Sequence, residues 1–289
     1  MESIPNILFK EKPGHWNGFE LIDLPSLLNN PLVELDHNPH HPHRLSFFAI
    51  IIIQDGEVHH ELDFKRYTLK TGDCLLISKG QIHAFDAASH YQGCMALFTE
   101  EFLLHHVAPA TLQKISRLYN YHLNLSQCHC PQENTQFLAN IQETQASPTS
   151  SITPNILAAY LTIYLLKLEQ IKHLNVITKS FDRKYEVFDA FKQKVEKNYP
   201  NSRNAKDYAQ QLAVSYKYLN ETCKAFTNKT AKNFIDDFVV LEAKRYLSSS
   251  ALSIKQISFQ CGFDEPTNFQ KYFKKYTGDT PAQFRQMYL

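Results

Sequence analysis

Residues 253–285 have the sequence SIKQISFQCGFDEPTNFQKYFKKYTGDTPAQFR, and part of this stretch repeats a segment 50 residues earlier in the chain. The earlier segment, 218–230, aligns with 268–280. Three identical pairs mark the match, namely Lys224/Lys274, Thr227/Thr277 and Thr230/Thr280. Asn228 aligns with Gly278, and these residue types best tolerate the left-handed conformation that ends a helix. Two copies are too few for a solenoid, so the repeat predicts two copies of one helical unit.

Each matched helix follows a shorter predicted helix, over 204–212 in the first copy and 253–260 in the second. A small residue, Ala213 or Gly262, stands in each turn and lets the chain bend sharply between the two helices. Ser215 is a natural N-cap for the matched helix of the first copy. The pattern predicts two helix-turn-helix units, each with a second helix that can enter a DNA groove, here called the recognition helix.

The charge distribution supports this interpretation. The whole chain has a net charge of +1, but residues 181–289 carry 18 Lys and Arg against 12 Asp and Glu, a net charge of +6. Residues 1–180 carry the other 12 basic and 17 acidic residues, a net charge of −5, and all 14 histidines. Double-stranded DNA is a polyanion that basic helices bind by releasing counterions, so DNA is the predicted partner. A helical bundle for protein contacts is the alternative.

The helical period predicts which side chains would touch DNA. Leu219 and Cys223 face inward on the first recognition helix, and Phe269 and Phe273 face inward on the second. The predicted DNA-binding residues are Ser215, Tyr216, Lys217, Asn220, Glu221 and Lys224 in the first unit and Thr267, Asn268, Gln270, Lys271, Lys274 and Lys275 in the second. Amide side chains can read adenine, lysine can read guanine, and glutamate can accept from cytosine. Lysines near the helix ends more often meet phosphates.

The first half of the chain has a different pattern. Short apolar or alternating segments separated by turn residues predict strands, over 45–54, 57–64, 67–69, 74–78, 83–85 and 91–98. Strands at this spacing are typical of a sandwich or a barrel. Residues 1–43 hold six of the 13 prolines and predict an irregular lead-in.

Helical patterns follow the strands, over 100–106, 109–119, 133–145 and 154–174. The last of these is apolar on more than one face, which indicates more than one packing partner. Its leucine face is the predicted dimerisation contact and consists of Leu157, Leu161, Leu165 and Leu168. A helix buried entirely within its own domain is the alternative.

Residues 253–285 resemble the signature of the AraC/XylS family of bacterial transcription regulators nearly throughout. The resemblance implies two helix-turn-helix units joined by a linker helix near 236–247, which enter successive major grooves. The first unit departs from the family pattern, because Glu221 stands where members often carry a basic base-reading residue. Cys223, Ala213 and Asn228 also replace residues that are common there. The resemblance therefore leaves open which bases the first recognition helix reads.

The N-terminal half resembles the sensor domain of the same family, chiefly through GDCLLISKGQIH at residues 72–83. The resemblance implies an α+β protein of two domains: a cupin-like β-barrel with dimerisation helices, then an all-α double helix-turn-helix. The expected limits are 1–175 for the first domain (barrel about 20–99, helices about 100–175), 176–180 for a linker and 181–289 for the second domain. The implied function is a transcriptional regulator, and more specifically an activator, that works as a homodimer with RNA polymerase.

A small-molecule effector in the barrel is implied as well. Arg44, Tyr67 and His83 are the residues expected to meet it, as an anionic ligand. We expect no cofactor and no enzymatic activity. The alternative is a metal-dependent cupin enzyme or a metal sensor, with His41, His43 and His83 as metal ligands; the Glu that usually accompanies such a set is missing from the sequence after His43.

The six cysteines do not form a disulfide framework and are expected to be free thiols in a reducing compartment. Cys128 and Cys130 flank His129, with His122 nearby, and this group is a second candidate for a soft metal or for redox chemistry. The apolar runs are far shorter than the roughly 20 residues that cross a bilayer. The N-terminal residues lack the pattern of a secretory signal. We therefore expect a soluble protein of the bacterial cytoplasm, associated with the nucleoid when bound to DNA.

Overall fold

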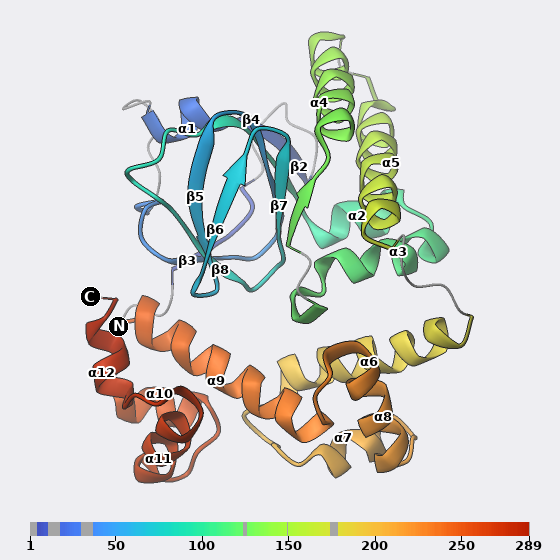
Figure 1. Ribbon diagram of the computed structural model, residues 1–289. Helices are drawn as coiled ribbons and strands as arrows, with labels where there is room; N and C mark the ends of the chain where they lie inside the picture. Colours follow the sequence, from blue (N-terminus) through green and yellow to red (C-terminus); the bar gives the residue numbers. More distant parts are fainter. Residues whose placement is uncertain are drawn as a thin grey trace. The chain divides into compact units, whose positions relative to one another are not determined.

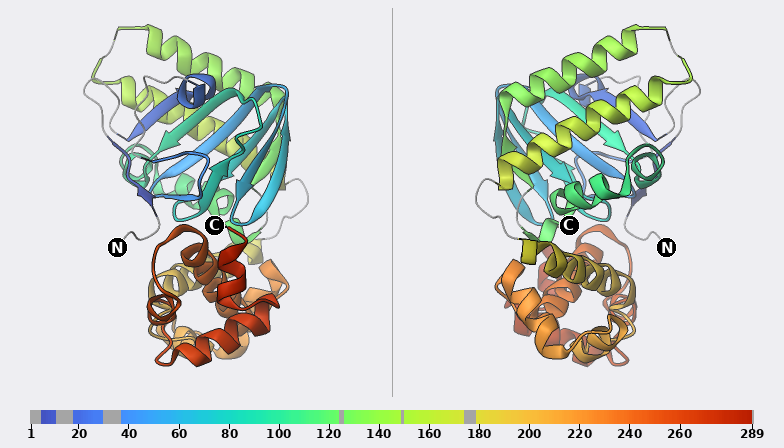
Figure 2. Two further views of the ribbon diagram at one scale, coloured as in Figure 1. Left: turned by 90° about the vertical axis from the view of Figure 1, so that its left-hand side faces the viewer. Right: turned by 90° about the vertical axis from the view of Figure 1, so that its right-hand side faces the viewer.

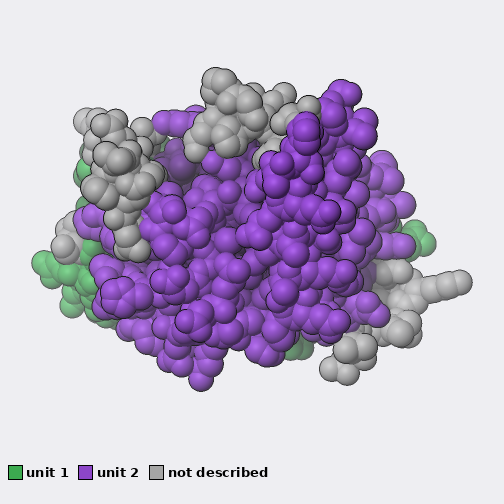
Figure 3. All heavy atoms as spheres, turned by 90° about the horizontal axis from the view of Figure 1, so that it is seen from above, with its two compact units in different colours: residues 1–5, 176–289 green, residues 6–175 purple. Residues whose placement is uncertain are grey.

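The computed structural model describes residues 5–10, 18–29, 37–123, 126–148, 150–173 and 179–288. The chain forms two compact units, one of residues 6–175 and a C-terminal one that contains residues 179–288 (Figure 3). The first is built on β-sheets and the second is all helical, so the predicted α+β class with two domains is confirmed. Of the predicted linker, residues 176–178 lie outside the described residues, and residues 179–180 begin a helix.

The N-terminal unit contains two five-stranded sheets (Figure 1). The first, sheet A, has in spatial order β1 (Asn6–Ile7), β3 (His43–Leu45), β8 (Ile82–Phe85), β5 (Glu57–Leu62) and β6 (Lys65–Lys70). The second, sheet B, has β10 (Gln127–His129), β7 (Asp73–Ile77), β4 (Phe48–Asp55), β9 (Gln92–Phe98) and β2 (Phe19–Asp23). All described strand pairs are antiparallel except β1 with β3.

Sheet B is apolar on both faces, which explains the unbroken apolar run in β4. Ile51 and Ile53 belong to the core between the two sheets, whereas Ile50 and Ile52 belong to a second core on the outer side of sheet B. Successive side chains of a strand point to opposite faces, so a strand buried on both faces loses the polar alternation of a half-exposed one.

Three strands, β1, β2 and β10, were not predicted from the sequence. The expectation of an irregular lead-in over residues 1–43 is wrong, because β1, β2 and helix α1 (Leu24–Asn29) lie there. Strand β2 pairs with β9 along its whole length, about 75 positions further along the chain. Strand β10, which contains Cys128 and His129, pairs with β7. Both are edge strands of sheet B, and their pairing is set by residues far away in sequence.

Four helices cover the outer face of sheet B (Figures 1 and 2): α2 (Glu100–His106), α3 (Pro109–Ile115), α4 (Pro131–Ala146) and α5 (Thr153–His173). Short 3₁₀ segments, η1 (Ser116–Tyr119) and η2 (Tyr121–Leu123), follow α3. Helices α4 and α5 run side by side.

The leucine face of α5 packs inward. Leu157, Leu161, Leu165 and Leu168 are each 0% exposed and belong to the core that joins α5 to sheet B. This corrects the prediction that these four leucines form the dimerisation contact, since they are already used within their own unit. The apolar side chains that α5 leaves exposed are those of Ile156, Ala159 and Ile163.

The C-terminal unit contains seven helices within the described residues: α6 (Lys179–Asn198), α7 (Ala205–Gln211), α8 (Tyr216–Thr227), α9 (Ala231–Ser249), α10 (Ile254–Gln260), α11 (Pro266–Thr277) and α12 (Pro281–Gln286). Helices α7 and α8 form the first helix-turn-helix, and α10 and α11 form the second. Helix α9 lies between them and contacts all six other helices of the unit (Figure 1). Among the helices that the structure describes, none is long and apolar enough to span a bilayer.

The turn of the second unit fits against the loop before α7. Gly262 has φ +75°, and a Cβ atom there would lie 2.0 Å from the carbonyl oxygen of Pro200. Three residues further on in that loop, the guanidinium of Arg203 stacks over the ring of Phe263, 3.8 Å from its centroid. The turn of the second helix-turn-helix therefore contacts the loop that leads into the first, and both helix-turn-helix units also pack against α9.

Replacing Gly262→Ala is expected to lower the free energy of unfolding of the C-terminal unit by about 2–3 kcal/mol. The new methyl group would meet a backbone oxygen, and alanine disfavours a positive φ. Gly278→Ala is the matched control, because Gly278 has a similar φ of +87° with nothing within 4 Å of the added Cβ; only about 1 kcal/mol should be lost there. Urea unfolding of the full chain, followed by circular dichroism at a helical wavelength, measures both. Equal losses in the two variants would contradict the tight contact.

Candidate nucleic-acid interface and sensor interior

Helix α11 presents one buried and one exposed face, as the sequence predicted. Phe269 and Phe273 are buried, and both belong to the packing against the rest of the unit. The six predicted contact residues all lie exposed: Thr267, Asn268, Gln270, Lys271, Lys274 and Lys275. The helix begins with Pro266 at its first turn and ends at Gly278, which adopts the left-handed conformation. Amide and ammonium groups thus stand together on one solvent-facing surface.

Helix α8 has the same organisation with one exception. Ser215, Tyr216, Lys217, Glu221 and Lys224 are exposed, and Leu219 and Cys223 are buried. Asn220 is only half exposed, and its Oδ1 accepts a hydrogen bond of 3.0 Å from the backbone N–H of Ala231.

That hydrogen bond corrects the prediction for Asn220. Its side chain ties the recognition helix to the first turn of α9, where a backbone N–H would otherwise have no intrahelical acceptor. The side-chain oxygen is therefore used inside the unit and not held out toward a base.

Glu221 lies one turn after Lys217 on the exposed surface of α8, and the Lys217 Nζ and Glu221 Oε1 atoms are 4.0 Å apart. Both side chains are largely in solvent, so the pair adds little to stability. Its relevance is electrostatic: a carboxylate beside the lysine offsets one positive charge on the surface that would face phosphates.

Asp236 of α9 is a residue that sequence analysis missed. It is 2% exposed, and its two carboxylate oxygens accept hydrogen bonds from the hydroxyls of Tyr272 (2.8 Å) and Tyr276 (2.7 Å) of α11. Lys232, one turn earlier on α9, also contacts the carboxylate. Burial raises the pKa of both tyrosines, to about 12 for Tyr276, so their hydroxyls stay protonated donors. The second recognition helix is thereby hydrogen-bonded to α9, which also packs against both helices of the first helix-turn-helix.

The inner face of sheet A carries a chain of buried polar groups. The hydroxyl of Tyr91 donates to the backbone carbonyl of His59, so its oxygen accepts from Nδ1 of His60, 3.2 Å away. The Nε2 atom of His60 is then unprotonated and accepts from Nδ1 of His83, also 3.2 Å away. This order leaves Nε2 of His83 as an acceptor. It is buried and has no hydrogen-bond partner among the described residues.

His43 extends this group along the sheet. It is the cross-strand partner of His83, and the two ring centroids lie 4.2 Å apart. His43, His60 and His83 are nearly inaccessible to solvent. Burial lowers the pKa of His43 to about 4 and that of His60 to about 3, and it lowers the pKa of His83 well below the usual value. All three imidazoles are therefore neutral near pH 7.

The three predicted effector residues do not lie together. His83 is on the inner face, and Tyr67 of β6 is the cross-strand partner of the inward-facing His60 and packs on the core between the sheets. Arg44 lies between His43 and Leu45, which both point inward, so alternation places Arg44 on the opposite face of sheet A. Tyr67 and His83 therefore lie on the same face of sheet A, and Arg44 lies on the opposite face.

The candidate metal ligands are separated as well. His41 is exposed, whereas His43 and His83 are buried, and Nδ1 of His43 is hydrogen-bonded to the backbone carbonyl of His41 at 2.9 Å. Within the described parts of the chain, no group of three or more His, Cys, Asp or Glu side chains is arranged to hold a metal ion. This applies also to the stretch Cys128–Cys130, where His129 instead pairs with Asp73 at 2.8 Å.

Comparisons with known proteins match both units. A model described as an AraC-like ligand binding domain matches residues 34–129, and one described as a helix-turn-helix domain matches residues 208–287. The chain is 23% identical to a transcriptional activator named RhaS from Escherichia fergusonii, over 86% of this chain and 87% of that protein. It is 36% identical to a histidine kinase of Formosa agariphila over 32% of this chain, but that match spans only 7% of the kinase. A crystal structure of ToxT from Vibrio cholerae aligns over 94% of this chain and 99% of that one, with 13% identity and a TM-score of 0.45.

The buried histidines predict a specific loss of stability in acid. An unfolded histidine takes up a proton below about pH 6.5, whereas these three stay neutral in the folded unit. These three histidines should therefore leave the free energy of unfolding unchanged above about pH 6.5. As the pH drops from there toward 5, each of the three should lower it by about 1.4 kcal/mol per pH unit. Urea unfolding of the full chain at pH 7.5, 6.5, 5.8 and 5.2 measures the slope.

His43→Phe keeps an aromatic ring against His83 and removes one titratable group, so it should reduce this slope by about 1.4 kcal/mol per pH unit. His59→Phe is the control for the exchange of a histidine for a phenylalanine, since His59 lies on the opposite face of β5 and is only partly buried. An unchanged slope for His43→Phe would show that His43 is not held neutral in the folded unit.

Proposed function

Since the chain belongs to the AraC/XylS family of DNA-binding transcriptional regulators, we propose that α8 and α11 enter DNA and that a small effector in the N-terminal unit controls this binding. The observation that carries the proposal is the exposed surface of α11. Six polar or basic side chains face solvent there, three of them lysines, while the aromatic face is buried. This is the arrangement that reads base edges and phosphates in a major groove.

The proposed effector is an uncharged molecule that presents a hydrogen-bond donor, such as a hydroxyl or an amide N–H. The acceptor for it is the buried Nε2 of His83. The neutral imidazoles favour this class over the anion expected from the sequence, and Arg44 lies on the other face of sheet A. Binding would satisfy a buried polar atom, which is worth more than the same hydrogen bond in water.

The regulator is favoured over a metal-dependent cupin enzyme. Both matching family models describe parts of regulators, and the curated relative that matches most of the chain is named as a transcriptional activator. The exposed position of His41 also takes one ligand out of the metal set that the enzyme would need.

We further propose that the protein works as a homodimer, activates transcription through contact with RNA polymerase, and acts in the cytoplasm at the nucleoid. The dimer contact proposed in place of the leucine face is an exposed apolar stripe that consists of Ile152, just before α5, and Ile156, Ala159 and Ile163 of α5. These positions are spaced by three or four residues, so they form one seam along the helix surface.

The DNA-binding proposal predicts different effects for different residues of α11. Gln270→Ala should weaken binding to the selected site by about 1–3 kcal/mol and leave binding to an unrelated duplex unchanged, because a lost base contact removes specificity. Lys271→Ala should also weaken specific binding. Lys274→Ala should weaken binding to both duplexes and reduce the slope of log affinity against log salt by about one.

The site is obtained by mapping bound DNA across the genome, and affinities are measured by fluorescence anisotropy at several salt concentrations. Lys197→Ala, an exposed lysine on α6, is the control and should have little effect on either duplex. Parent affinity in both Gln270→Ala and Lys271→Ala would reject α11 as the reading helix. Loss of binding to every duplex in all variants, with a lowered melting temperature, would report unfolding instead.

The dimer proposal predicts that Ile163→Glu converts the protein to a monomer at micromolar concentration, because a carboxylate would be buried against an apolar seam. Ile163 is 52% exposed in one chain, so the change should leave the melting temperature of the unit nearly unchanged. Leu104→Glu is the matched control, an exposed apolar residue on α2. Sedimentation velocity gives the mass of each variant. A parent protein that is itself monomeric, alone and on DNA, would exclude the homodimer.

A further inference from the structure

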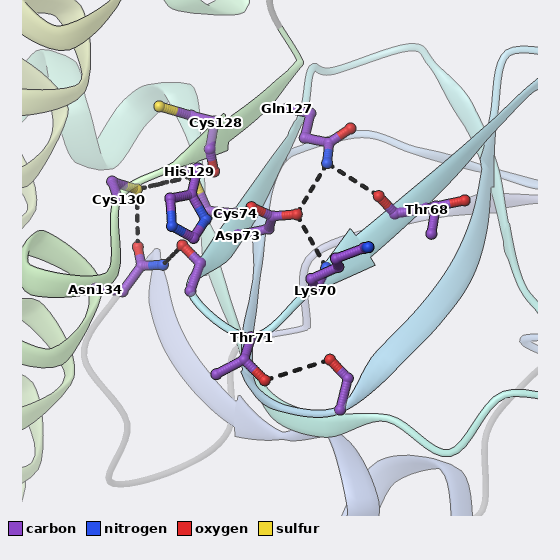
Figure 4. A network of polar contacts seen from close by, with 12 residues as sticks. Thr68, Lys70, Thr71, Asp73, Cys74, Gln127, Cys128, His129, Cys130 and Asn134 are labelled. Carbon is purple, nitrogen blue, oxygen red and sulfur yellow. Dashed lines mark hydrogen bonds and ion pairs between the residues drawn. The ribbon is translucent and has the colours of Figure 1, made fainter.

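Cys74 lies close to two cysteines that are distant from it in the sequence, Cys128 and Cys130, at the outer face of sheet B (Figure 4). Cys74 lies on β7, Cys128 is its cross-strand partner on β10, and Cys130 is the N-cap of α4. The Sγ atoms of Cys74 and Cys130 are 3.6 Å apart. This group, the thiol cluster, belongs to the core that holds the helices on the sheet.

The thiol cluster is part of a polar network and not only of an apolar core. The Cys130 thiol donates to Oδ1 of Asn134 at 3.2 Å, and the hydroxyl of Tyr164 on α5 donates to the same oxygen at 2.6 Å. The side-chain N–H of Asn134 donates to the backbone carbonyl of Gly72 at 2.9 Å. One thiol therefore helps to fix the relative position of α4, α5 and the turn before β7.

A cavity gives small molecules access to this network. A space of about 290 Å³ lies between β4, the turn at residues 71–72 and α4, and Asn134 is one of its lining residues. Asn134 also accepts the hydrogen bond of the Cys130 thiol, so this one side chain contacts both the cavity and the sulfur.

The surroundings favour one negative charge within the cluster. The neighbouring thiols of Cys130 and Cys74, together with the nearby Lys172 and His129, lower the pKa of the Cys128 thiol. The neighbouring thiol raises the pKa of Cys74 and of Cys130, since each would then add a second charge. The cluster therefore keeps its negative charge on Cys128, while the sulfur atoms of Cys74 and Cys130 lie side by side as thiols.

We propose that the thiol cluster is an oxidation site at which a hydroperoxide converts Cys74 and Cys130 into a disulfide. Cys130 is the thiol assigned to attack first, because its hydrogen-bond acceptor lines the cavity. Cys74 is assigned to resolve the product, because its sulfur is the nearest to that of Cys130. Cys128 is a positioning residue that holds the charge of the cluster.

The chemistry balances in two steps. The Cys130 sulfur attacks the peroxide to form an S–O bond, the O–O bond breaks, and the leaving hydroxide takes the proton of the Cys130 thiol to become water. The Cys74 sulfur then attacks the sulfenic acid, an S–S bond forms, and a second water leaves. In total, two thiols and one hydrogen peroxide give one disulfide and two waters.

The disulfide would change the packing of α4 and α5. The two sulfur atoms would approach from 3.6 Å to about 2.05 Å. Cys130 would lose its S–H, so Asn134 would keep only the Tyr164 hydroxyl as a donor to its Oδ1. The first turn of α4 would be drawn toward β7, and α5, which carries the proposed dimer seam, contacts α4 along its length.

The test treats the reduced full-length protein with hydrogen peroxide and maps disulfides by mass spectrometry of peptides. We expect a loss of two hydrogens, about 2 Da, in one linked peptide pair that contains Cys74 and Cys130, reversed by dithiothreitol. It should form at least tenfold faster than any oxidation of Cys94, which is equally buried but donates to Gln54 outside the cluster.

Cys74→Ser and Cys130→Ser should abolish the linked pair, Cys128→Ser should form it about tenfold more slowly, and Cys94→Ser should behave like the parent. Far-ultraviolet circular dichroism of each variant checks folding, and the map of the parent protein stands even where a variant does not fold. A disulfide that joins another pair, or oxidation of the cluster no faster than that of Cys94, would overturn the proposal. Because the readout is covalent mass, it does not depend on DNA binding.

Discussion

The C-terminal unit depends on a single constraint, the burial of α9. Thirteen of the 19 residues of this helix are buried, so almost its whole circumference is occupied by other helices of the unit. It even buries an ion pair, Glu242 with Arg245 at 2.5 Å, where the charges must satisfy each other. A helix held on all sides cannot rotate or slide without breaking both helix-turn-helix units. The distance between α8 and α11 is therefore fixed by packing before DNA is present.

Polar contacts make the same connection more specific. Asn220 of α8 caps the first turn of α9, and Asp236 of α9 accepts from two tyrosines of α11. The apolar cores would tolerate small shifts, but these hydrogen bonds have short and directional geometry. For the proposed entry of α8 and α11 into DNA, such rigidity lowers the entropy lost on binding.

Sheet B has a comparable role in the N-terminal unit. Leu75 and Ile77 of β7 face the interior with the histidines, whereas Cys74 and Leu76 face the helices. A displacement of the side chains on one face of β7 is transmitted to the other face, because the side chains are close-packed. The effector proposed for the interior and the oxidation proposed for the thiol cluster would thus act on the same layer, from opposite faces.

The sequence predicted those features that depend on local periodicity. The exposed face of α11 follows from the 3.6-residue period, and the two helix-turn-helix units follow from the internal repeat. Features set by distant partners were not predictable. Strand β2 gains its identity from β9, and the buried role of Asp236 comes from tyrosines 36 and 40 positions later. Helix α5 is apolar on several faces, so its period could not tell which face packs inward.

The two recognition helices are not equivalent. On α8, Glu221 offsets Lys217, and Asn220 is engaged within the unit. On α11, three lysines and two amide side chains are exposed with no acidic residue among the predicted contacts. Attraction to phosphates grows with the number of basic groups that reach them, so α11 should supply most of the affinity. Because α9 fixes the spacing of the two helices, α8 would enter its groove with little further loss of entropy. A carboxylate on α8 can then favour one base without preventing binding.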